Sequence, residues 1–196
     1  MIDRHLTDEQ KSTIENAVRD ILIALGDNPD REGLVETPQR VARMYDEVYE
    51  GMRYTNDEIA EKFNKCFDEA QSSDLVLMRN IEVFSHCEHH LALIYNMKVH
   101  IAYVPNGRVI GLSKLARIAD LVSKRLQLQE RITSDIADVL EKILNTSDIF
   151  VVVDAEHSCM TSRGINKPGT VTTTRVARGR FSNDSELRNE VLLSIE

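Results

Sequence analysis

The sequence has no tryptophan, few aromatic residues and no long apolar run. A helix that crosses a bilayer needs about 20 consecutive apolar residues, and no stretch of this chain approaches that length. The N-terminus also lacks the basic and then apolar pattern of a secretory signal peptide. We therefore expect neither a membrane-spanning segment nor a leader, and otherwise the composition is ordinary for a globular protein.

Cysteine is also scarce, and the 24 Lys and Arg residues are outnumbered by 32 Asp and Glu residues. The three cysteines are an odd number, which does not favour a disulfide framework and indicates a reducing cytoplasm. Cys66 has no histidine or other cysteine nearby, so we interpret it as a packing residue. The net charge of -8 argues against nonspecific binding to nucleic acid or to an anionic membrane. A small polyanion, which needs only a local cluster of Arg and Lys, is not excluded.

Glycine-rich phosphate loops, dinucleotide fingerprints and internal repeats are absent from the sequence. The length of 196 residues fits one domain, with or without an appended helical segment. Helical periodicity dominates the first part, in residues 1–25, in a helix from Thr37-Pro38 to Gly51, and in a charged, partly irregular piece over residues 56–70. Thr7 and Gln10 fit a capping box. We therefore expect an N-terminal helical segment, 1–70, followed by a second domain, 71–196, which the family resemblance given below implies is the catalytic one.

From Asp74 onward the apolar residues alternate, as they do in strands. We expect a strand with an irregularity near Arg79-Asn80, a second strand over 91–104, and a tight Asn-Gly hairpin to a return strand over 108–112. His100 then lies on the strand surface.

Two helices, over 113–125 with Ser113 as the N-cap and over 129–144, precede strands at 149–153 and 170–176 and a last helix at 184–195. Strands grouped in hairpins predict an α+β fold with an antiparallel sheet. Open sheet edges need covering or pairing, so we expect oligomerisation.

The stretch Cys87-Glu88-His89-His90 and the later His157-Ser158-Cys159 carry the clearest chemical signal. Cys87 and His90 have a spacing at which one tight turn can direct both side chains to one ion, and Cys159 can add a third ligand from a distant strand. Three such ligands suit a tetrahedral Zn²⁺ with an open fourth position. A lone Cys-x-x-His is weak evidence, because free cysteine is often simply buried. Four of the six histidines, however, fall in or next to these two clusters, namely His86, His89, His90 and His157.

His89 and His157 are the candidate proton-transfer groups beside this ion. His89 shares a turn with two ligands. His157 stands two residues before Cys159, which on one strand would place both side chains on one face. The alternative is that both histidines are exposed or have a supporting role only.

Several charged residues could hold an anionic substrate. Lys114 and Arg117 lie on one helix face in an N-terminal turn, where backbone N–H groups also favour anions. Arg163 follows Cys159 by four positions, and Glu130 is a carboxylate that could accept two hydrogen bonds from guanine. Taken singly, each is more simply a solvated charge, and the same holds for Arg40 and Arg43.

Together these motifs resemble the GTP cyclohydrolase I family over residues 8–195. The residues that carry the resemblance are Glu36-Thr37-Pro38-Gln39-Arg40, Cys87-Glu88-His89-His90, Gly111-Leu112-Ser113-Lys114, Gln127-Leu128-Gln129-Glu130-Arg131 and His157-Ser158-Cys159 with Arg163-Gly164. The resemblance implies the tunnelling fold, an antiparallel sheet with two helices packed on one side. It also implies that subunits join their sheets into a barrel, in a homodecamer of two pentamers with active sites between subunits.

The resemblance further implies roles for single residues. Cys87, His90 and Cys159 resemble the zinc ligands, His89 the acid that protonates the purine N7, and His157 the acid/base at the ribose, with Ser113 near the same sugar. Glu130 resembles the carboxylate that holds the guanine, with Gln129 beside it among the substrate-binding residues. The triphosphate ligands correspond to Lys114, Arg117, Arg163 and Arg40, and less clearly to Arg43.

The implied activity is zinc-dependent opening of the guanine imidazole ring of GTP, giving formate and 7,8-dihydroneopterin triphosphate for pterin or tetrahydrofolate synthesis. Two alternatives stay open. One is a tunnelling-fold relative acting on another purine or deazapurine, which would need a nucleophilic cysteine free of metal. The other is a non-catalytic zinc-containing assembly protein, which would need a fourth protein ligand. The chain departs from the family pattern at Leu126, where many members have proline, and in residues 175–183.

Overall fold

The computed structural model of the chain describes residues 4–68 and 74–195. Parts of the helical pieces expected over 1–25 and 56–70 therefore fall outside the described residues. In chain order the elements are α1 (Asp8–Ala24), α2 (Thr37–Val48), the 3-10 helix η1 (Glu50–Arg53), α3 (Asn56–Phe63), β1 (Cys66–Asp68), β2 (Val76–Cys87), β3 (Ala92–Tyr103), β4 (Arg108–Ile110), α4 (Leu112–Ser123), β5 (Leu126–Gln127), α5 (Gln129–Leu144), β6 (Ile149–His157), α6 (Ser158–Thr161), β7 (Val171–Ala177), α7 (Arg180–Asn183) and α8 (Ser185–Ile195).

Internal contacts divide the chain into two compact units, Met1–Arg53 and Tyr54–Glu196. In the first unit α1 packs against α2. The predicted capping box is present, because Thr7 Oγ1 accepts from the Gln10 backbone N–H at 3.2 Å and Gln10 Oε1 accepts from the Thr7 N–H at 2.9 Å. The contact boundary places α3 in the second unit. The division into an N-terminal segment, 1–70, and a catalytic domain, 71–196, stays a prediction.

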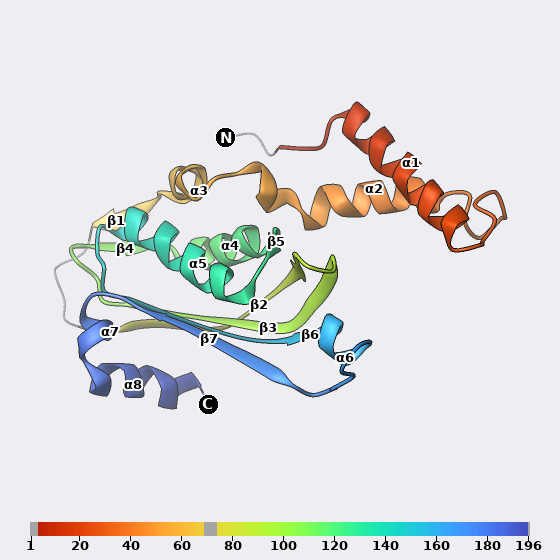
Figure 1. Ribbon diagram of the computed structural model, residues 1–196. Coiled ribbons are helices and arrows are strands. Elements are labelled where there is room, and N and C mark those ends of the chain that lie inside the picture. The colour runs from red at the N-terminus through yellow and green to blue at the C-terminus, as the bar shows by residue number, and fades with distance from the viewer. Residues whose placement is uncertain (1–3, 69–73, 196) are drawn as a thin grey trace. The chain divides into compact units, whose positions relative to one another are not determined.

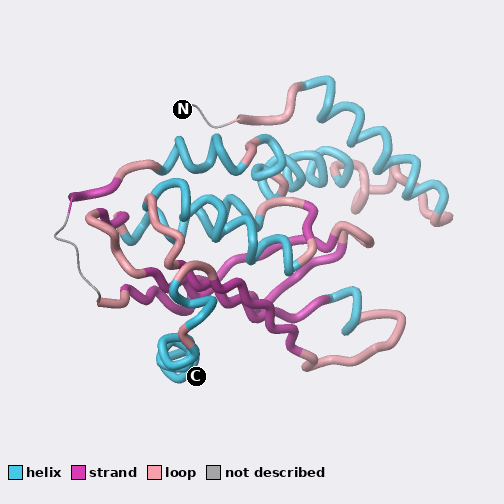
Figure 2. The backbone as a smooth tube through the Cα atoms, turned by 60° about the vertical axis from the view of Figure 1, so that its left-hand side comes forward, coloured by secondary structure: helices cyan, strands magenta, loops and turns pink. Residues whose placement is uncertain are grey.

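The second unit is built on a five-stranded sheet in the order β5-β2-β3-β6-β7. The long strands are antiparallel, and the short β5 alone runs parallel to its neighbour β2. Helices α4 and α5 cover one face, which gives the expected α+β arrangement (Figures 1 and 2). Burial of their apolar stripes against the sheet forms the main core, which includes Leu115, Ile118, Val122, Ile136, Leu140, Val99, Ile101, Val151 and Val153.

A second apolar cluster covers part of the opposite face of the sheet. The rings of Phe150 and Phe181 stack with centroids 5.6 Å apart, and Val191 of α8 joins them. The prediction that His100 lies on the strand surface is wrong, since His100 is only 3% exposed. The predicted alternation of side chains along β3 is correct. Alternation alone predicts that one face of the sheet is buried and the other exposed, but here both faces are buried.

Two strand pairings differ from the sequence prediction. The turn at Pro105–Gly107 forms, and Gly107 has the positive φ of 72° that such a turn requires. The return strand β4, however, pairs with β1 and not with β3. The third helical piece correspondingly ends at Phe63, and Cys66 begins β1. The Cys66 thiol is half-buried, as expected of a packing residue.

The start of α4 is also displaced from the prediction. Gly111 is the N-cap, the helix begins at Leu112, and no side chain caps it. Ser113 therefore lies inside the first turn, where its hydroxyl does not serve as the predicted cap. The expected irregularity near Arg79-Asn80 is confirmed, because the β2–β3 register shifts between Met78 and Ile81 and Asn80 has a φ of 58°.

Candidate active site

The turn between β2 and β3 holds two of the predicted ligands close together. β2 ends at Cys87, and the His90 N–H donates to the Cys87 carbonyl at 3.4 Å. Leu91 closes the turn with a left-handed φ of 51°. The Cys87 Sγ lies 3.8 Å from His90 Nδ1 and 4.0 Å from His89 Nδ1. The Cys-x-x-His spacing thus brings a thiol and two imidazoles together within one turn.

The sheet brings Cys159 to this turn from a distant part of the sequence. Ser85 pairs with Ile94, and Ile94 pairs with His157, so these three residues lie in a row across β2, β3 and β6. His157 ends β6, and Cys159 lies on the short helix α6. The expectation that Cys159 continues a strand is therefore wrong. Its sulfur nevertheless reaches the cluster, since the ligand atoms of Cys87, His90 and Cys159 all lie within 4.8 Å of one another.

This donor set fits a divalent metal ion. Ligand atoms bound tetrahedrally at about 2.1–2.3 Å from zinc lie roughly 3.4–3.8 Å apart, and the Cys87–His90 separation is 3.8 Å. Burial raises the pKa of the Cys159 thiol, and the neighbouring Cys87 raises it further while Arg163 opposes the shift. A bound cation would favour the thiolate form of such a thiol, because a metal ligand must be deprotonated. The cluster can hold a metal.

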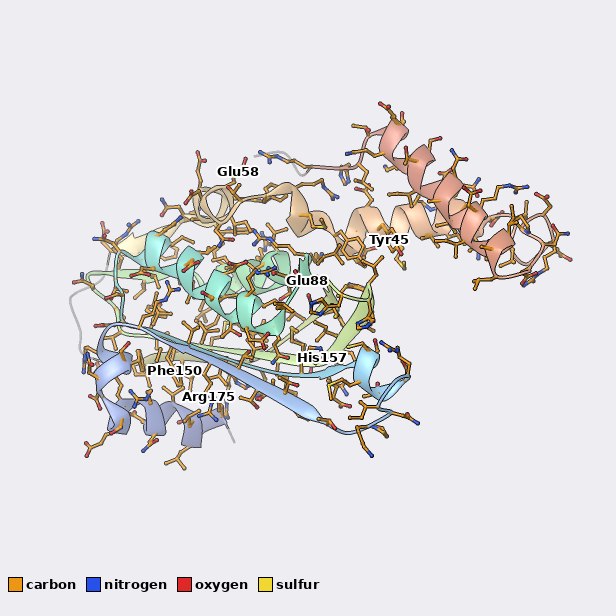
Figure 3. All side chains as sticks on the ribbon, viewed as in Figure 1. Tyr45, Glu58, Glu88, Phe150, His157 and Arg175 are labelled. Carbon is orange, nitrogen blue, oxygen red and sulfur yellow. The ribbon has the colours of Figure 1, made fainter. Side chains whose placement is uncertain are left out.

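A pocket of about 220 Å³ lies beside the cluster. Both candidate proton-transfer histidines, both cysteines of the cluster and the predicted guanine ligand Glu130 line this one cavity. Figure 3 shows Glu88, on the ligand turn, and His157 at the same end of the sheet. The lining residues are Cys87, His89, Gln127, Leu128, Gln129, Glu130, His157, Cys159, Met160 and Thr172.

The segment between α4 and α5 forms one wall of this pocket. β5 runs parallel to the end of β2, pairing Gln127 with Cys87, and the Glu88 N–H donates to the Gln127 carbonyl at 3.2 Å. Asp135 of α5 holds this segment in place, because its carboxylate accepts from both Arg125 and the Gln127 side chain at 2.9 Å. The sequence alone gave no indication of this support, since Asp135 belongs to no recognisable motif.

The Gln129 side chain is buried and fully hydrogen-bonded. It is 1% exposed, and its Nε2 donates to the carbonyls of Val153 at 2.9 Å and Thr172 at 2.8 Å. Its Oε1 lies 2.8 Å from His157 Nε2. Burial lowers the pKa of His157, and the charge of Glu130 opposes this effect. That Gln129 binds the substrate stays a prediction, and both N–H donors of its amide are already used within the protein.

Other predicted substrate residues do not line this pocket in the part of the chain that the structure describes. Ser113, Lys114 and Arg117 occupy the first half of α4, whereas the site lies beyond its last residue, where β5 follows. With 12 residues, α4 is about 18 Å long at 1.5 Å per residue. Figure 1 shows β4 leading into one end of α4 and β5 leaving the other.

The last two predicted phosphate ligands occupy different units. Arg163 lies in the segment after α6 and acts electrostatically on Cys159. Arg40 lies on α2 in the first unit, where it pairs with Glu36 at 2.6 Å. Arg43 lies on the same helix. Among the described residues of the second unit, Arg163 is therefore the one predicted phosphate ligand that interacts with a cysteine of the cluster.

The fold and the site define an α+β protein with a Cys₂His cluster that could hold a metal ion, beside a pocket lined by two histidines and a carboxylate. A family model described as GTP cyclohydrolase I matches residues 14–196. The chain belongs to the GTP cyclohydrolase I family.

Similar proteins span nearly the whole chain. GTP cyclohydrolase 1 of Clostridium acetobutylicum is 60% identical over 183 residues, which is 91% of this chain and 94% of that protein. GTP cyclohydrolase 1 of Clostridium botulinum strain Loch Maree is 58% identical, covering 92% of this chain and 94% of the relative. The protein of that name from Ruminiclostridium cellulolyticum is 54% identical over 188 residues, covering 93% and 96%. Among the described residues, none of the helices is long and apolar enough to cross a membrane.

Proposed function

We propose that this protein hydrolyses GTP by opening the imidazole ring of its guanine, releasing C8 as formate and closing the product to 7,8-dihydroneopterin triphosphate. The observation that carries this proposal is the convergence of Cys87, His90 and Cys159 within 4.8 Å of one another. Family membership supplies the substrate and the reaction.

Zinc is the metal that the donor set favours, because two thiolates and an imidazole are the ligands of catalytic zinc sites that keep one position open. When bound, zinc supplies a hydroxide nucleophile near neutral pH and stabilises the negative charge that develops on oxygen. The protein's own part is to hold the base of the nucleotide so that its C8 lies beside the Cys87–His90 turn.

His89 and His157 move the protons. His89 Nδ1 lies 4.0 Å from the Cys87 sulfur, so an acid on this ring reaches the five-membered ring of a guanine held at the cluster and can protonate its N7. His157 lines the same pocket. We assign it proton transfer at the ribose in the later steps, with Ser113 of a neighbouring subunit near the same sugar.

Glu130 recognises the base. It stands exposed in the first turn of α5 and lines the pocket. A carboxylate there can accept hydrogen bonds from the N1–H and the 2-amino group of guanine, a paired contact that favours guanine over bases without the amino group.

We further propose that the active site is completed between subunits. The pocket of about 220 Å³ is smaller than the roughly 300 Å³ at which ligand pockets usually begin, and the first half of α4 lies away from it. Lys114 and Arg117 of a neighbouring subunit, with Arg163 and Arg40, would then bind the triphosphate. Strand β7 pairs only with β6 within the described residues, which leaves an edge that a neighbour's sheet can extend into a barrel. We expect a homodecamer of two pentamers, acting in the cytoplasm to supply a pterin for tetrahydrofolate synthesis.

Neither of the two alternative functions is favoured by a specific observation. A deazapurine-directed relative needs a metal-free nucleophilic cysteine, but Cys87 and Cys159 both belong to the cluster. A structural zinc site needs a fourth protein ligand, and the three-residue Cys87–His90–Cys159 group has none in the part of the chain that the structure describes.

The test is GTP turnover with formate quantified, in zinc-loaded protein, after treatment with a chelator, and after zinc is restored. We expect turnover to disappear with the chelator and to return with zinc. The Cys159→Ala variant should lose both bound zinc and formate release, while Cys66→Ala, which removes a thiol outside the cluster, should keep both. Zinc-loaded protein that binds GTP without releasing formate would disprove the proposal.

A further inference from the structure

The amide of Gln129 connects three parts of the site. It projects from the first turn of α5, between the carbonyl groups of β6 and β7 and the ring of His157. Its side chain is 1% exposed, so these contacts exclude water. A buried amide with every donor engaged is held in one orientation.

The hydrogen-bond partners fix which end of the amide faces His157. Two backbone carbonyls, those of Val153 and Thr172, can only accept, so the amide atom between them must be the NH₂ group. The atom facing His157 at 2.8 Å must then be the carbonyl oxygen. An oxygen acceptor requires a donor, so Nε2 of His157 carries a hydrogen. The two backbone carbonyls thus determine both the orientation of the Gln129 amide and the nitrogen of His157 that carries the hydrogen.

The consequence concerns the other nitrogen of the ring. With Nε2–H committed to Gln129, the neutral imidazole has its lone pair on Nδ1. Within the described part of the chain, Nδ1 of His157 makes no hydrogen bond, and the ring lines the pocket. The nitrogen available to a substrate is therefore Nδ1.

We infer that Gln129 is a positioning residue, which fixes the ring orientation and tautomer of His157 so that Nδ1 exchanges the proton with the substrate. This inference deepens the proposed function and rests on it for the identity of the substrate. It assigns Gln129 a role different from a direct contact with guanine, which falls to Glu130 alone. The same amide also ties α5 to β6 and β7, so Gln129 keeps His157 aligned with the sheet end that carries the cluster.

The first measurement needs no variant. Histidine ¹⁵N shifts of His157 in the zinc-free protein, assigned by comparison with His157→Ala, should report the tautomer with hydrogen on Nε2. A His157 ring with hydrogen on Nδ1 in the wild-type protein would overturn the inference. The tautomer can be measured without turnover, so this experiment tests the inference about Gln129 independently of the proposed function. The proposed function is tested separately, and it fails if the wild-type protein releases no formate.

The second measurement uses Gln129→Leu, which removes the amide and keeps a buried side chain. The matched control is Thr133→Val, one helical turn further on. Thr133 is also buried, bonds Thr174 of β7 at 2.6 Å, and contacts the backbone carbonyl of Gln129 but not its amide or His157. The control should show a similar loss of stability, with the wild-type His157 tautomer and wild-type turnover.

For Gln129→Leu we expect saturated turnover to fall about tenfold to a hundredfold, part of the roughly hundredfold or larger contribution of a positioned acid or base. GTP affinity of the zinc-free protein should stay within about twofold of wild type, because no substrate contact is lost. In a His157→Ala background the same substitution should have no further effect on turnover. A large loss of GTP affinity with unchanged saturated turnover, or effects that multiply in the double variant, would identify Gln129 as a substrate contact and overturn the inference.

Discussion

The Glu88 carboxylate accepts a 2.7 Å hydrogen bond from the Arg131 guanidinium. Glu88 stands between the cluster residue Cys87 and His89, and Arg131 follows Glu130 on the first turn of α5. This ion pair therefore links the turn that carries two of the proposed metal ligands to the turn that carries Glu130, the proposed guanine ligand. Both side chains are partly exposed, at 30% and 50%, so water and salt screen the pair.

Because an exposed ion pair adds little to global stability, we expect Arg131→Met to leave the melting temperature unchanged. It should, however, loosen the ligand turn and weaken zinc binding by about tenfold, the lower end of what outer supporting contacts contribute. Competition with a chromophoric chelator measures the zinc affinity. Lys142→Met, which removes an exposed ion pair with Asp57 far from the cluster along α5, is the control and should bind zinc as the wild type does.

Glu130→Gln tests recognition of the base. Replacing a carboxylate by an amide removes charge-assisted acceptance from two guanine donors and should raise the KM for GTP roughly tenfold to a hundredfold. The wild type should prefer GTP to ITP, which lacks the 2-amino group, and the variant should largely lose that preference. A variant that keeps the full preference would show that another group reads the 2-amino position.

His100 makes stability depend on pH. Its ring is buried, its Nδ1 accepts from the Asn80 N–H at 3.4 Å, and Asp154 lies 3.9 Å from Nε2. Burial lowers the pKa of His100, with Asp154 opposing and Lys98 and Arg79 adding to the shift. The folded state thus binds its proton less readily than the unfolded state. Its stabilising contribution is complete above the ordinary pKa of about 6.5 and is lost as the pH falls below it.

We expect the wild type to lose more unfolding free energy between about pH 7.5 and pH 5.5 than His100→Gln, which keeps an acceptor for Asn80 but cannot ionise. Chemical denaturation at both pH values, in protein with the same metal content, measures the difference. The other histidines are present in both proteins, so their contributions to the pH dependence of the unfolding free energy cancel in the comparison. Equal losses in the two proteins would contradict the assignment.

The capping box of α1 gives a prediction about the first unit alone. Thr7→Ala removes the acceptor for the Gln10 N–H and should destabilise this helix by about 1 kcal/mol. Hydrogen exchange of the α1 amides should accelerate accordingly, with amides of the β3–β6 core unchanged. Thr13→Ala, whose hydroxyl bonds only the Glu9 carbonyl within the helix, serves as the control and should show a smaller effect.

Features that depend on neighbouring residues were determined by the sequence itself. The Thr7–Gln10 capping box, the apolar stripes of α4 and α5 and the closeness of Cys87 to His90 all follow from spacings of three or four residues, which helix and turn geometry convert directly into position. The family resemblance, carried by several such short motifs, adds Cys159 as the expected third ligand and GTP as the expected substrate. Each of these features depends on short stretches of sequence alone.

Features that depend on which segments meet were decided only by the tertiary structure. β4 pairs with β1 although an Asn-Gly turn favours a hairpin with β3, because a strand's partner is chosen by long-range packing as well as by its turn. His100 is buried on β3, two residues from Ala102, which belongs to the second apolar cluster formed with Phe181 and Val191. The bond between Gln129 and His157 likewise exists only because α5 lies across the ends of β6 and β7. Residues distant in the chain acquire such relationships through the burial of shared apolar surface, which no local pattern specifies.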